Sequence, residues 1–231
     1  MSSENVAFRR DALGGDVTEA INFSFDPRCP WCYQTSRWAL RLEALHVITL
    51  RWSVFCLELN RFQGEHETFD PDTSKSAPAL RTSVVVRDAE GHEACGRFYA
   101  AIGRRYFFDL EDLSQRGVIR AALDDADLDA SLCEKALGDR STWDTVLGEH
   151  ERLANEGGVF GVPSLRLGDG QGPSMFGPVI KEVPPDDEAI ELLTHVLWLM
   201  KSSNFYELKS GRPELPDLPY IKKALAERSA R

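Results

Sequence analysis

The chain has 231 residues, of which 42% are hydrophobic and 10% aromatic. A chain of this length and composition can bury a core that needs no disulfide bonds for its stability. The formal net charge of -10 argues against nucleic acid or an anionic membrane surface as a partner, because both select for clustered Lys and Arg.

The first 18 residues are expected to form a polar N-terminal extension (1–18). They contain no apolar stretch like the core of a signal peptide, and no later segment is long enough to span a bilayer. We therefore expect a cytoplasmic protein with no membrane partner. Thiols are kept reduced in the cytoplasm, so the five cysteines indicate one working pair and three free thiols rather than a disulfide framework.

A strand and a turn are predicted just before the first two cysteines. Ile21, Phe23 and Phe25 alternate with polar residues, which is the period of a half-buried strand. Asp26-Pro27-Arg28 then supplies the residues of a turn.

A helix is predicted to begin within the sequence Cys29-Pro30-Trp31-Cys32. From here the apolar residues recur at steps of three and four, as on one face of a helix: Trp31, Thr35, Trp38, Leu42 and Leu45. Cys29 is expected near the N-cap and Pro30 at the first helical position. The two cysteines therefore lie at a strand-to-helix junction.

A second strand is predicted from Ile48 to Val54, where apolar and polar residues alternate again. The opening unit is thus strand, helix, strand. A connection of this length predicts parallel strands joined by a right-handed crossover.

The middle of the chain reads as a helical insertion, residues 59–156. Residues 60–78 are expected to form a polar loop, and helices are expected at 118–126, 128–137 and 143–155. One further helix is indicated by an apolar stripe of Cys95, Phe98, Tyr99, Ile102 and Tyr106.

The second half is predicted to contain a hairpin and a helix. Pro163 precedes a short strand at 164–167, a glycine-rich turn at 168–172 and a second strand around 175–176. A helix is expected from Asp186, with an apolar face of Ile190, Leu193, Leu197 and Met200. A polar, proline-rich tail follows (209–231).

The cysteine pair predicts thiol-disulfide chemistry. The thiolate is the nucleophilic form of cysteine, and a helix N-terminus stabilises it by its free N–H groups and positive dipole end. Cys29 benefits most and is the predicted nucleophile. Cys32, one turn further in, is expected to be more buried and less acidic, which suits it to resolve a mixed disulfide on Cys29.

Four further residues are predicted to bind substrate: Pro30, Trp31, Val162 and Pro163. A proline opening a hairpin strand is a plausible cis peptide that would present the Val162 backbone to an extended substrate beside Cys29. The low base rate of cis X-Pro bonds nevertheless favours a trans Pro163. Trp31 either packs under the helix or forms the apolar floor of a substrate groove.

Several segments of the chain resemble the DsbA-like branch of the thioredoxin superfamily, and within it the actinobacterial mycothiol-dependent reductases, also described as DsbA-like nitroreductases. The resemblance spans most of residues 20–220. It is carried by Phe25-Asp26-Pro27-Arg28-Cys29-Pro30-Trp31-Cys32, Thr35-Ser36-Arg37-Trp38, Gly161-Val162-Pro163-Ser164, Phe176-Gly177-Pro178-Val179 and Phe205-Tyr206-Glu207-Leu208-Lys209.

The resemblance implies an α/β protein with a thioredoxin fold of the DsbA-like type. Its thioredoxin-like domain would comprise 19–58 and 157–208, with the helical insertion domain 59–156 between the βαβ and ββα halves and the C-terminal tail 209–231. Pro163 would match the family's cis-proline, which faces the cysteine pair.

The same resemblance implies a thiol-disulfide reductase with no tightly bound cofactor. A low-molecular-weight thiol, mycothiol or glutathione, would be the electron donor, and the substrate would be a small thiol or disulfide or a protein disulfide. One position departs from the wider pattern. Many thioredoxin-fold proteins carry a buried acid six residues before the first cysteine, and here that residue is Phe23, which leaves the proton acceptor for Cys32 unidentified.

Two other functions are compatible with the sequence. A kappa-type glutathione transferase or isomerase shares the fold, but commonly has serine as its nucleophile, which the intact pair Cys29 and Cys32 weighs against. A non-catalytic chaperone or metal-binding module is the third possibility. A zinc site would need a second closely spaced Cys/His pair, which the chain lacks, so no metal is expected. Cys56, Cys95 and Cys133 are interpreted as core residues.

Overall fold

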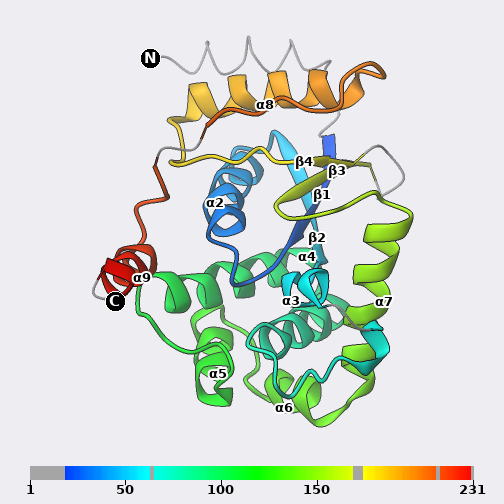
Figure 1. Ribbon diagram of the computed structural model, residues 1–231, viewed down its shortest axis with the longest axis vertical. Helices are drawn as coiled ribbons and strands as arrows, with labels where there is room; N and C mark the ends of the chain where they lie inside the picture. Colours follow the sequence, from blue (N-terminus) through cyan, green and yellow to red (C-terminus); the bar gives the residue numbers. More distant parts are fainter. Residues whose placement is uncertain (1–18, 63–64, 169–173, 212–213, 230–231) are drawn as a thin grey trace.

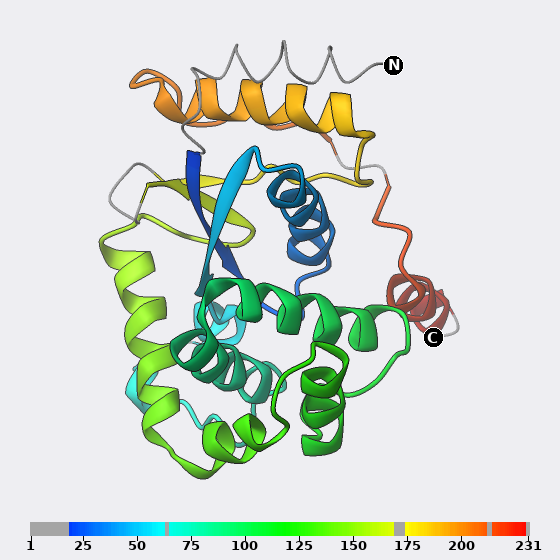
Figure 2. The ribbon, with the colours of Figure 1, turned by 180° about the vertical axis from the view of Figure 1, so that it is seen from behind.

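The computed structural model describes residues 19–62, 65–168, 174–211 and 214–229. Within them, a mixed sheet lies at the centre of the molecule with the strand order β2-β1-β3-β4 (Figure 1). Figures 1 and 2 show one long helix at one end of the molecule and most of the other helices at the opposite end, with the sheet between them.

The first half of the sheet is formed as predicted. β1 (Glu19–Phe25) and β2 (Ile48–Val54) are parallel and in register from Glu19 opposite Ile48 to Phe25 opposite Val54. α2 (Pro30–Ala44) connects them. The alternation of apolar residues in both strands places their larger side chains on one face of the sheet.

The hairpin of the second half completes the sheet. β3 (Ser164–Leu167) runs antiparallel to β1, and β4 (Ser174–Phe176) runs antiparallel to β3. The predicted glycine-rich turn falls mostly on residues 169–173, which lie outside the described residues. α8 (Asp186–Lys201) follows, and all four residues of its predicted apolar face are buried. α9 (Pro219–Ser229) ends the described chain.

Helices occupy the segment between β2 and β3, which is the predicted insertion. They are α3 (Leu57–Arg61), the short 3₁₀ helix η1 (His66–Thr68), α4 (Ala77–Phe107), α5 (Arg116–Asp125), α6 (Ser131–Gly138) and α7 (Ser141–Asn155). The polar loop expected at 60–78 is wrong in part, because η1 lies within it and α3 and α4 reach into its ends. α4 is much longer than its apolar stripe predicted, and it bends at Gly91, whose φ of 88° departs from helical geometry. The division into domains stays a prediction.

α4 packs on the sheet through a group of aromatic side chains. The ring of Tyr99 lies 4.1 Å from that of Phe25 and 5.5 Å from that of Trp52, measured between centroids. Gly96 permits this close approach, since a Cβ added there would lie 2.9 Å from the indole nitrogen of Trp52. Cys56, Cys95 and Cys133 are buried, as predicted.

α2 and α8 are joined by polar contacts as well as by apolar packing. The indole N–H of Trp38 donates to the carbonyl of Ala189 at 3.1 Å. Arg41 makes two hydrogen bonds to Asp186, at 2.7 and 2.6 Å, where the negative charge also favours the start of α8. None of the helices in the described ranges is both long and apolar enough to cross a membrane.

The outer edge of β2 is covered by side chains instead of another strand. The backbone N–H groups of Leu50, Trp52 and Val54 donate to Glu43, His92 and Glu149, respectively, at 2.7 to 2.9 Å. An edge strand with unpaired N–H groups is open to pairing with another chain. Here α2, α4 and α7 each supply one acceptor, so the insertion is tied to the sheet by hydrogen bonds.

A buried ion pair forms part of this edge. Both carboxylate oxygens of Glu149 accept from the guanidinium group of Arg87 at 2.8 Å, and Arg87 also donates to the carbonyl of Trp52 at 3.1 Å. Glu149 is 5% exposed. Removing one partner of such a pair leaves the other charge buried and uncompensated, which is strongly destabilising.

We therefore expect Glu149→Ala to lower the free energy of unfolding by about 3–5 kcal/mol, measured by chemical denaturation. Glu151→Ala is the matched control on the same helix, because Glu151 is partly exposed and contacts His66. Its loss should be about 0–1 kcal/mol. Equal, small losses in the two variants would contradict the assigned role of Glu149.

Candidate active site

The two cysteines of the predicted pair lie at the start of α2. Cys29 is the N-cap residue, with extended backbone angles, and Pro30 is the first helical residue. The sulfur of Cys29 accepts the backbone N–H of Cys32 at 3.3 Å. The sulfur therefore takes the place that a Ser or Asp oxygen takes in an ordinary N-cap.

The two thiols differ in exposure and acidity. Cys29 is 6% exposed and Cys32 is fully buried. A hydrogen bond from the Cys32 thiol lowers the pKa of Cys29, while burial and the charge of Asp26 oppose that shift. Burial, together with the interaction with Cys29, raises the pKa of Cys32 well above its ordinary value. This asymmetry suits Cys29 to ionise first.

Val162 and Pro163 are brought directly to the pair. The thiol of Cys29 donates to the carbonyl of Val162 at 3.4 Å. The Val162–Pro163 peptide bond is cis, so the trans bond favoured by the base rate is wrong and the cis-proline implied by the resemblance is confirmed. The base rate of X-Pro bonds omits tertiary context, which here fixes both flanking carbonyls: that of Val162 contacts Cys29, and that of Pro163 accepts the N–H of Gly177 at 2.8 Å.

Pro30 and Trp31 lie beside the sulfur of Cys29 in the first turn of α2. Both are partly exposed, and Trp31 packs against the main core. That contact accounts for the packing role considered for Trp31. Its role as the floor of a substrate groove stays a prediction.

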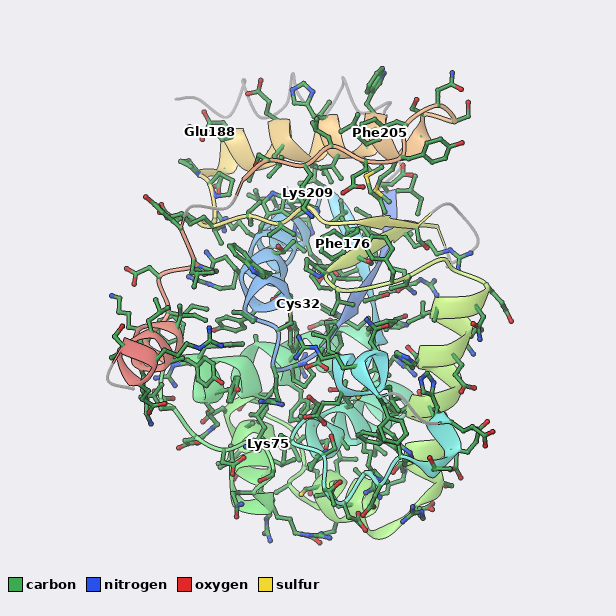
Figure 3. All side chains as sticks on the ribbon, viewed as in Figure 1. Cys32, Lys75, Phe176, Glu188, Phe205 and Lys209 are labelled. Atoms are coloured by element: carbon green, nitrogen blue, oxygen red, sulfur yellow. The ribbon has the colours of Figure 1, made fainter. Side chains whose placement is uncertain are left out.

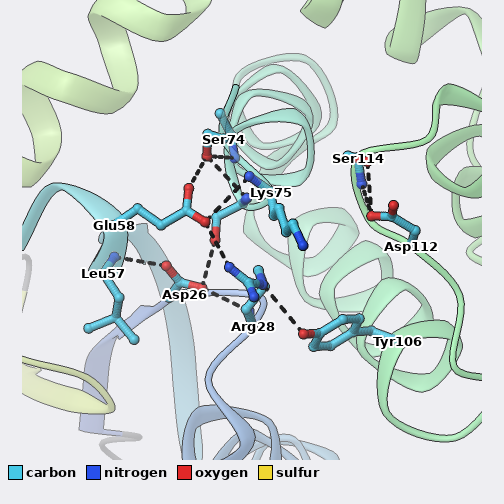
Figure 4. Close-up of polar contacts among 11 residues, drawn as sticks. Asp26, Arg28, Leu57, Glu58, Ser74, Lys75, Tyr106, Asp112 and Ser114 are labelled. Atoms are coloured by element: carbon cyan, nitrogen blue, oxygen red, sulfur yellow. Dashed lines mark hydrogen bonds and ion pairs between the residues drawn. The ribbon is translucent and has the colours of Figure 1, made fainter. Parts of the chain in front are cut away.

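Asp26 is part of the site, although its sequence pattern predicts only a turn residue. It is 1% exposed. Its Oδ1 accepts the N–H of Arg28 at 2.8 Å and the hydroxyl of Ser76 at 3.3 Å, and its Oδ2 accepts the N–H of Leu57 at 2.8 Å (Figure 4). Burial raises the pKa of Asp26 to about 6, against the lowering effect of these hydrogen bonds.

The sequence indicates the turn at Asp26 but not the burial of its side chain. An Asp at the end of a buried strand, two residues before the N–H that it accepts, is typical of an Asx turn. The burial of Asp26 depends on Leu57 and Ser76, which are 31 and 50 positions further along the chain. Phe23, where the wider pattern has an acid, is buried against Trp52 with ring centroids 5.2 Å apart.

Arg28 carries the next set of contacts outward from the pair. Its guanidinium group donates to Glu58 at 2.7 Å and to the hydroxyl of Tyr106 at 3.4 Å (Figure 4). The ring of Tyr106 in turn packs against that of Tyr220 in α9, with centroids 4.6 Å apart. Residues of α3, α4 and α9 therefore meet around the turn that precedes Cys29.

A pocket of about 740 Å³ lies between the segment before β3, β4 and the segment after α8. Its lining comes from separate segments of the chain: residues 158–160, Ser164, β4 with residues 177–179, Val196 and Leu199 of α8, and residues 205–210. Figure 3 labels three of the lining residues, Phe176 of β4 and Phe205 and Lys209 of the segment after α8. At its mouth the exposed rings of Phe160 and Phe176 are stacked, with centroids 5.4 Å apart. The volume falls in the range of small-molecule sites.

No cluster of three or more His, Cys, Asp or Glu side chains that could hold a metal ion is found in the part of the chain that the structure describes. All five cysteines are free thiols.

The chain is similar to known proteins in both sequence and fold. The model of the family described as Rv2466c-like, mycothiol-dependent nitroreductase Rv2466c, matches residues 28–210. An uncharacterized protein of Mycobacterium tuberculosis, Rv2286c, is 34% identical over 201 residues, which cover 85% of this chain and 83% of that protein.

Solved structures show the same fold at low sequence identity. The cytosolic disulfide reductase DsbM from Pseudomonas aeruginosa has a TM-score of 0.57 at 18% identity, covering 78% of this chain and 99% of that one. The thiol-disulfide exchange protein alpha-DsbA2 from Wolbachia pipientis has a TM-score of 0.53 at 12% identity, covering 85% and 99%. The fold is therefore the DsbA-like thioredoxin fold, as predicted.

The family match covers the cysteine pair, the Pro163 loop and the segments that line the pocket. This chain is therefore a DsbA-like oxidoreductase that belongs to the Rv2466c-like, mycothiol-dependent family.

Proposed function

We propose that the protein is a thiol-disulfide reductase in which Cys29 is the nucleophile and Cys32 the resolving thiol. The observation that carries this proposal is the position of the Cys29 sulfur, which caps the N-terminus of α2 and accepts the N–H of Cys32 at 3.3 Å. Such a position stabilises a thiolate. The buried Cys32 keeps its proton until a mixed disulfide forms beside it.

The reaction proceeds in two exchanges. The Cys29 thiolate attacks one sulfur of a substrate disulfide, a new sulfur–sulfur bond forms, and the other substrate sulfur leaves as a thiolate that takes up a proton. Cys32 then loses its proton and attacks Cys29, which releases the second substrate thiol. Two electrons pass from the dithiol to the substrate, and the chain is left with a Cys29–Cys32 disulfide.

Two molecules of a small thiol restore the dithiol in the reverse direction and leave as their own disulfide. The family description calls its nitroreductase mycothiol-dependent, and DsbM has been solved with GSH. We propose mycothiol, or a thiol of similar size, as the donor here. Such a pool exists in a reducing compartment, so the cytoplasm is the proposed location. Small disulfides and protein disulfides are both proposed as substrates, with no role for nucleic acid or a membrane.

Substrate is proposed to approach past Pro30 and Trp31 on one side and Val162 and Pro163 on the other. The contact between Cys29 and the Val162 carbonyl supports this placement, because it puts a backbone edge directly beside the reacting sulfur. The stacked rings of Phe160 and Phe176 line the pocket, and Phe160 lies two residues before Val162 in the same loop. An apolar group attached to the substrate disulfide would pack there.

One alternative on the same fold is a glutathione transferase or isomerase of the kappa type. A 2-hydroxychromene-2-carboxylate isomerase has a TM-score of 0.57 at 12% identity, which concerns the fold alone. That reading gives no role to Cys32, whereas the geometry pairs Cys32 closely with Cys29. The redox proposal therefore accounts for more of the site.

Alkylation at mildly acidic pH should label Cys29 ahead of the other four thiols, because it alone combines a lowered pKa with some exposure. Burial raises the pKa of Cys56 and of Cys95 to about 12, and it also raises the pKa of Cys32 and Cys133. We expect a rate advantage of at least about tenfold, measured by peptide mass spectrometry after short exposures. Equal labelling of all five thiols would be incompatible with the assignment of Cys29.

Replacing the resolving thiol should stop the cycle after its first step. In Cys32→Ser, Cys29 is expected to attack a substrate disulfide or the disulfide of the donor thiol and to release one thiol. The other half stays on Cys29 as a mixed disulfide, which intact mass measurement would detect.

The oxidised wild-type protein, offered mycothiol, glutathione and a thioredoxin system separately, should recover free Cys29 most rapidly with mycothiol. Cys56→Ser is the matched control and should cycle normally. Full activity in Cys29→Ser would refute the proposal.

A further inference from the structure

The carboxyl group of Asp26 is held rigidly on the turn that leads into Cys29. The backbone carbonyl of Asp26 accepts the N–H of Cys29 at 3.0 Å, which closes the turn. The side chain is fixed by Arg28, Leu57 and Ser76, from the turn, the start of α3 and the start of α4 (Figure 4). Cys32 lies one helical turn beyond Cys29, in the same buried region.

The charge of Asp26 acts on both thiols of the pair, because it raises the pKa of Cys29 and of Cys32. Arg28 is the closest cation, but its guanidinium group already contacts Glu58 at 2.7 Å. Glu58 is further bonded to the hydroxyl of Ser74 and to the N–H of Lys75 at 3.3 Å. The remaining titratable groups that face this region are neutral at pH 7 or are thiols of the pair: Cys29 and Cys32 of α2, Cys56 before α3, and Tyr99 and Tyr106 of α4.

We propose that the buried carboxylate of Asp26 sets the redox poise of the cysteine pair, making it a stronger reductant by opposing the thiolate form of Cys29. This inference rests on the proposed reductase function and deepens it. Asp26 acts through space on the charge of the sulfur, so it is a tuning residue and not a catalytic one. It occupies a different position from the acid that Phe23 replaces.

The sign of the effect follows from linkage. The dithiol state gains stability when Cys29 ionises, and the disulfide state has no thiol to ionise. A nearby negative charge makes ionisation less favourable and therefore stabilises the dithiol state less. The disulfide is then harder to reduce, and the dithiol gives up its electrons more readily. The negative charge of Asp26 raises the pKa of both Cys29 and Cys32, in agreement with this sign.

The pH dependence gives this role a signature. Burial raises the pKa of Asp26 to about 6, so the carboxylate is charged at neutral pH and becomes neutral as the pH falls below that value. A protonated Asp and an Asn are both neutral and similar in shape. The difference in redox poise between the wild type and Asp26→Asn should therefore be present at neutral pH and disappear at acidic pH.

The test is the equilibrium of each protein with a glutathione redox buffer across this pH range, with dithiol and disulfide forms counted by mass after acid quenching. At neutral pH the equilibrium constant for reducing the Cys29–Cys32 disulfide should rise about tenfold in Asp26→Asn, equivalent to about 30 mV. Ser76→Ala removes one hydrogen-bond donor to the Asp26 carboxylate. The difference in redox poise caused by Asp26→Asn should then disappear at a higher pH. Asp112→Asn, which alters an exposed Asx turn of the same kind, is the matched control and should change nothing.

An unchanged equilibrium constant in a folded Asp26→Asn protein would overturn the proposal. If this variant fails to fold, the titration of the Asp26 carboxyl group in the wild type can be followed by nuclear magnetic resonance instead. Reciprocity requires the titration curve of Asp26 to differ between the dithiol and disulfide states, and identical curves would overturn the proposal as well. Failure of the wild-type pair to exchange electrons with any thiol couple would instead refute the reductase function itself.

Discussion

The turn from Asp26 to Cys29 is the constraint on which the rest of the site depends. One hydrogen bond, from the Cys29 N–H to the Asp26 carbonyl at 3.0 Å, closes this turn between β1 and α2. The closed turn places the sulfur of Cys29 at the N-terminus of α2 and turns the Asp26 side chain into the interior. The N-terminus of α2 favours the thiolate of Cys29, the proposed nucleophile, and the carboxylate of Asp26 opposes it. Both are therefore held in place by the same four residues.

The helical insertion contributes to the sheet and to the dithiol site at the same time. Its helices α4 and α7 supply the acceptors His92 and Glu149 to the free edge of β2. The start of α4 supplies the hydroxyl of Ser76 to Asp26, and Tyr106 near its end contacts Arg28. A movement of the insertion relative to the sheet would thus change the surroundings of Asp26 as well as the packing of the core.

The local features of the site could be predicted from the sequence because they depend on neighbouring residues. The alternation before Phe25 and the helical stripe after Trp31 indicate the junction that carries Cys29 and Cys32, and the asymmetry between the two thiols follows from it. These predictions describe a strand and a helix that the structure contains. The first half of α4 was missed, since it has no sharp apolar stripe to separate it from the polar loop before it.

The features that escaped prediction are set by contacts between distant parts of the chain. The buried side chain of Asp26 contacts Leu57 and Ser76, and the pocket joins segments that lie about 50 residues apart. The cis bond at Pro163 was implied by the resemblance alone, because it belongs to a loop whose carbonyls contact Cys29 and Gly177. Spacing within a sequence carries no information on such contacts. Resemblance to a family identified several of the segments, but not their arrangement around one cavity.

We propose above all that Cys29 and Cys32 form a two-electron donor built at the start of α2. The most direct measurement is the product of a single turnover, in which the reduced protein is mixed with a small disulfide, quenched with acid and mapped by peptide mass spectrometry. We expect the loss of two thiols per chain and one new disulfide, between Cys29 and Cys32. A disulfide at Cys56, Cys95 or Cys133, or no loss of thiols, would contradict it.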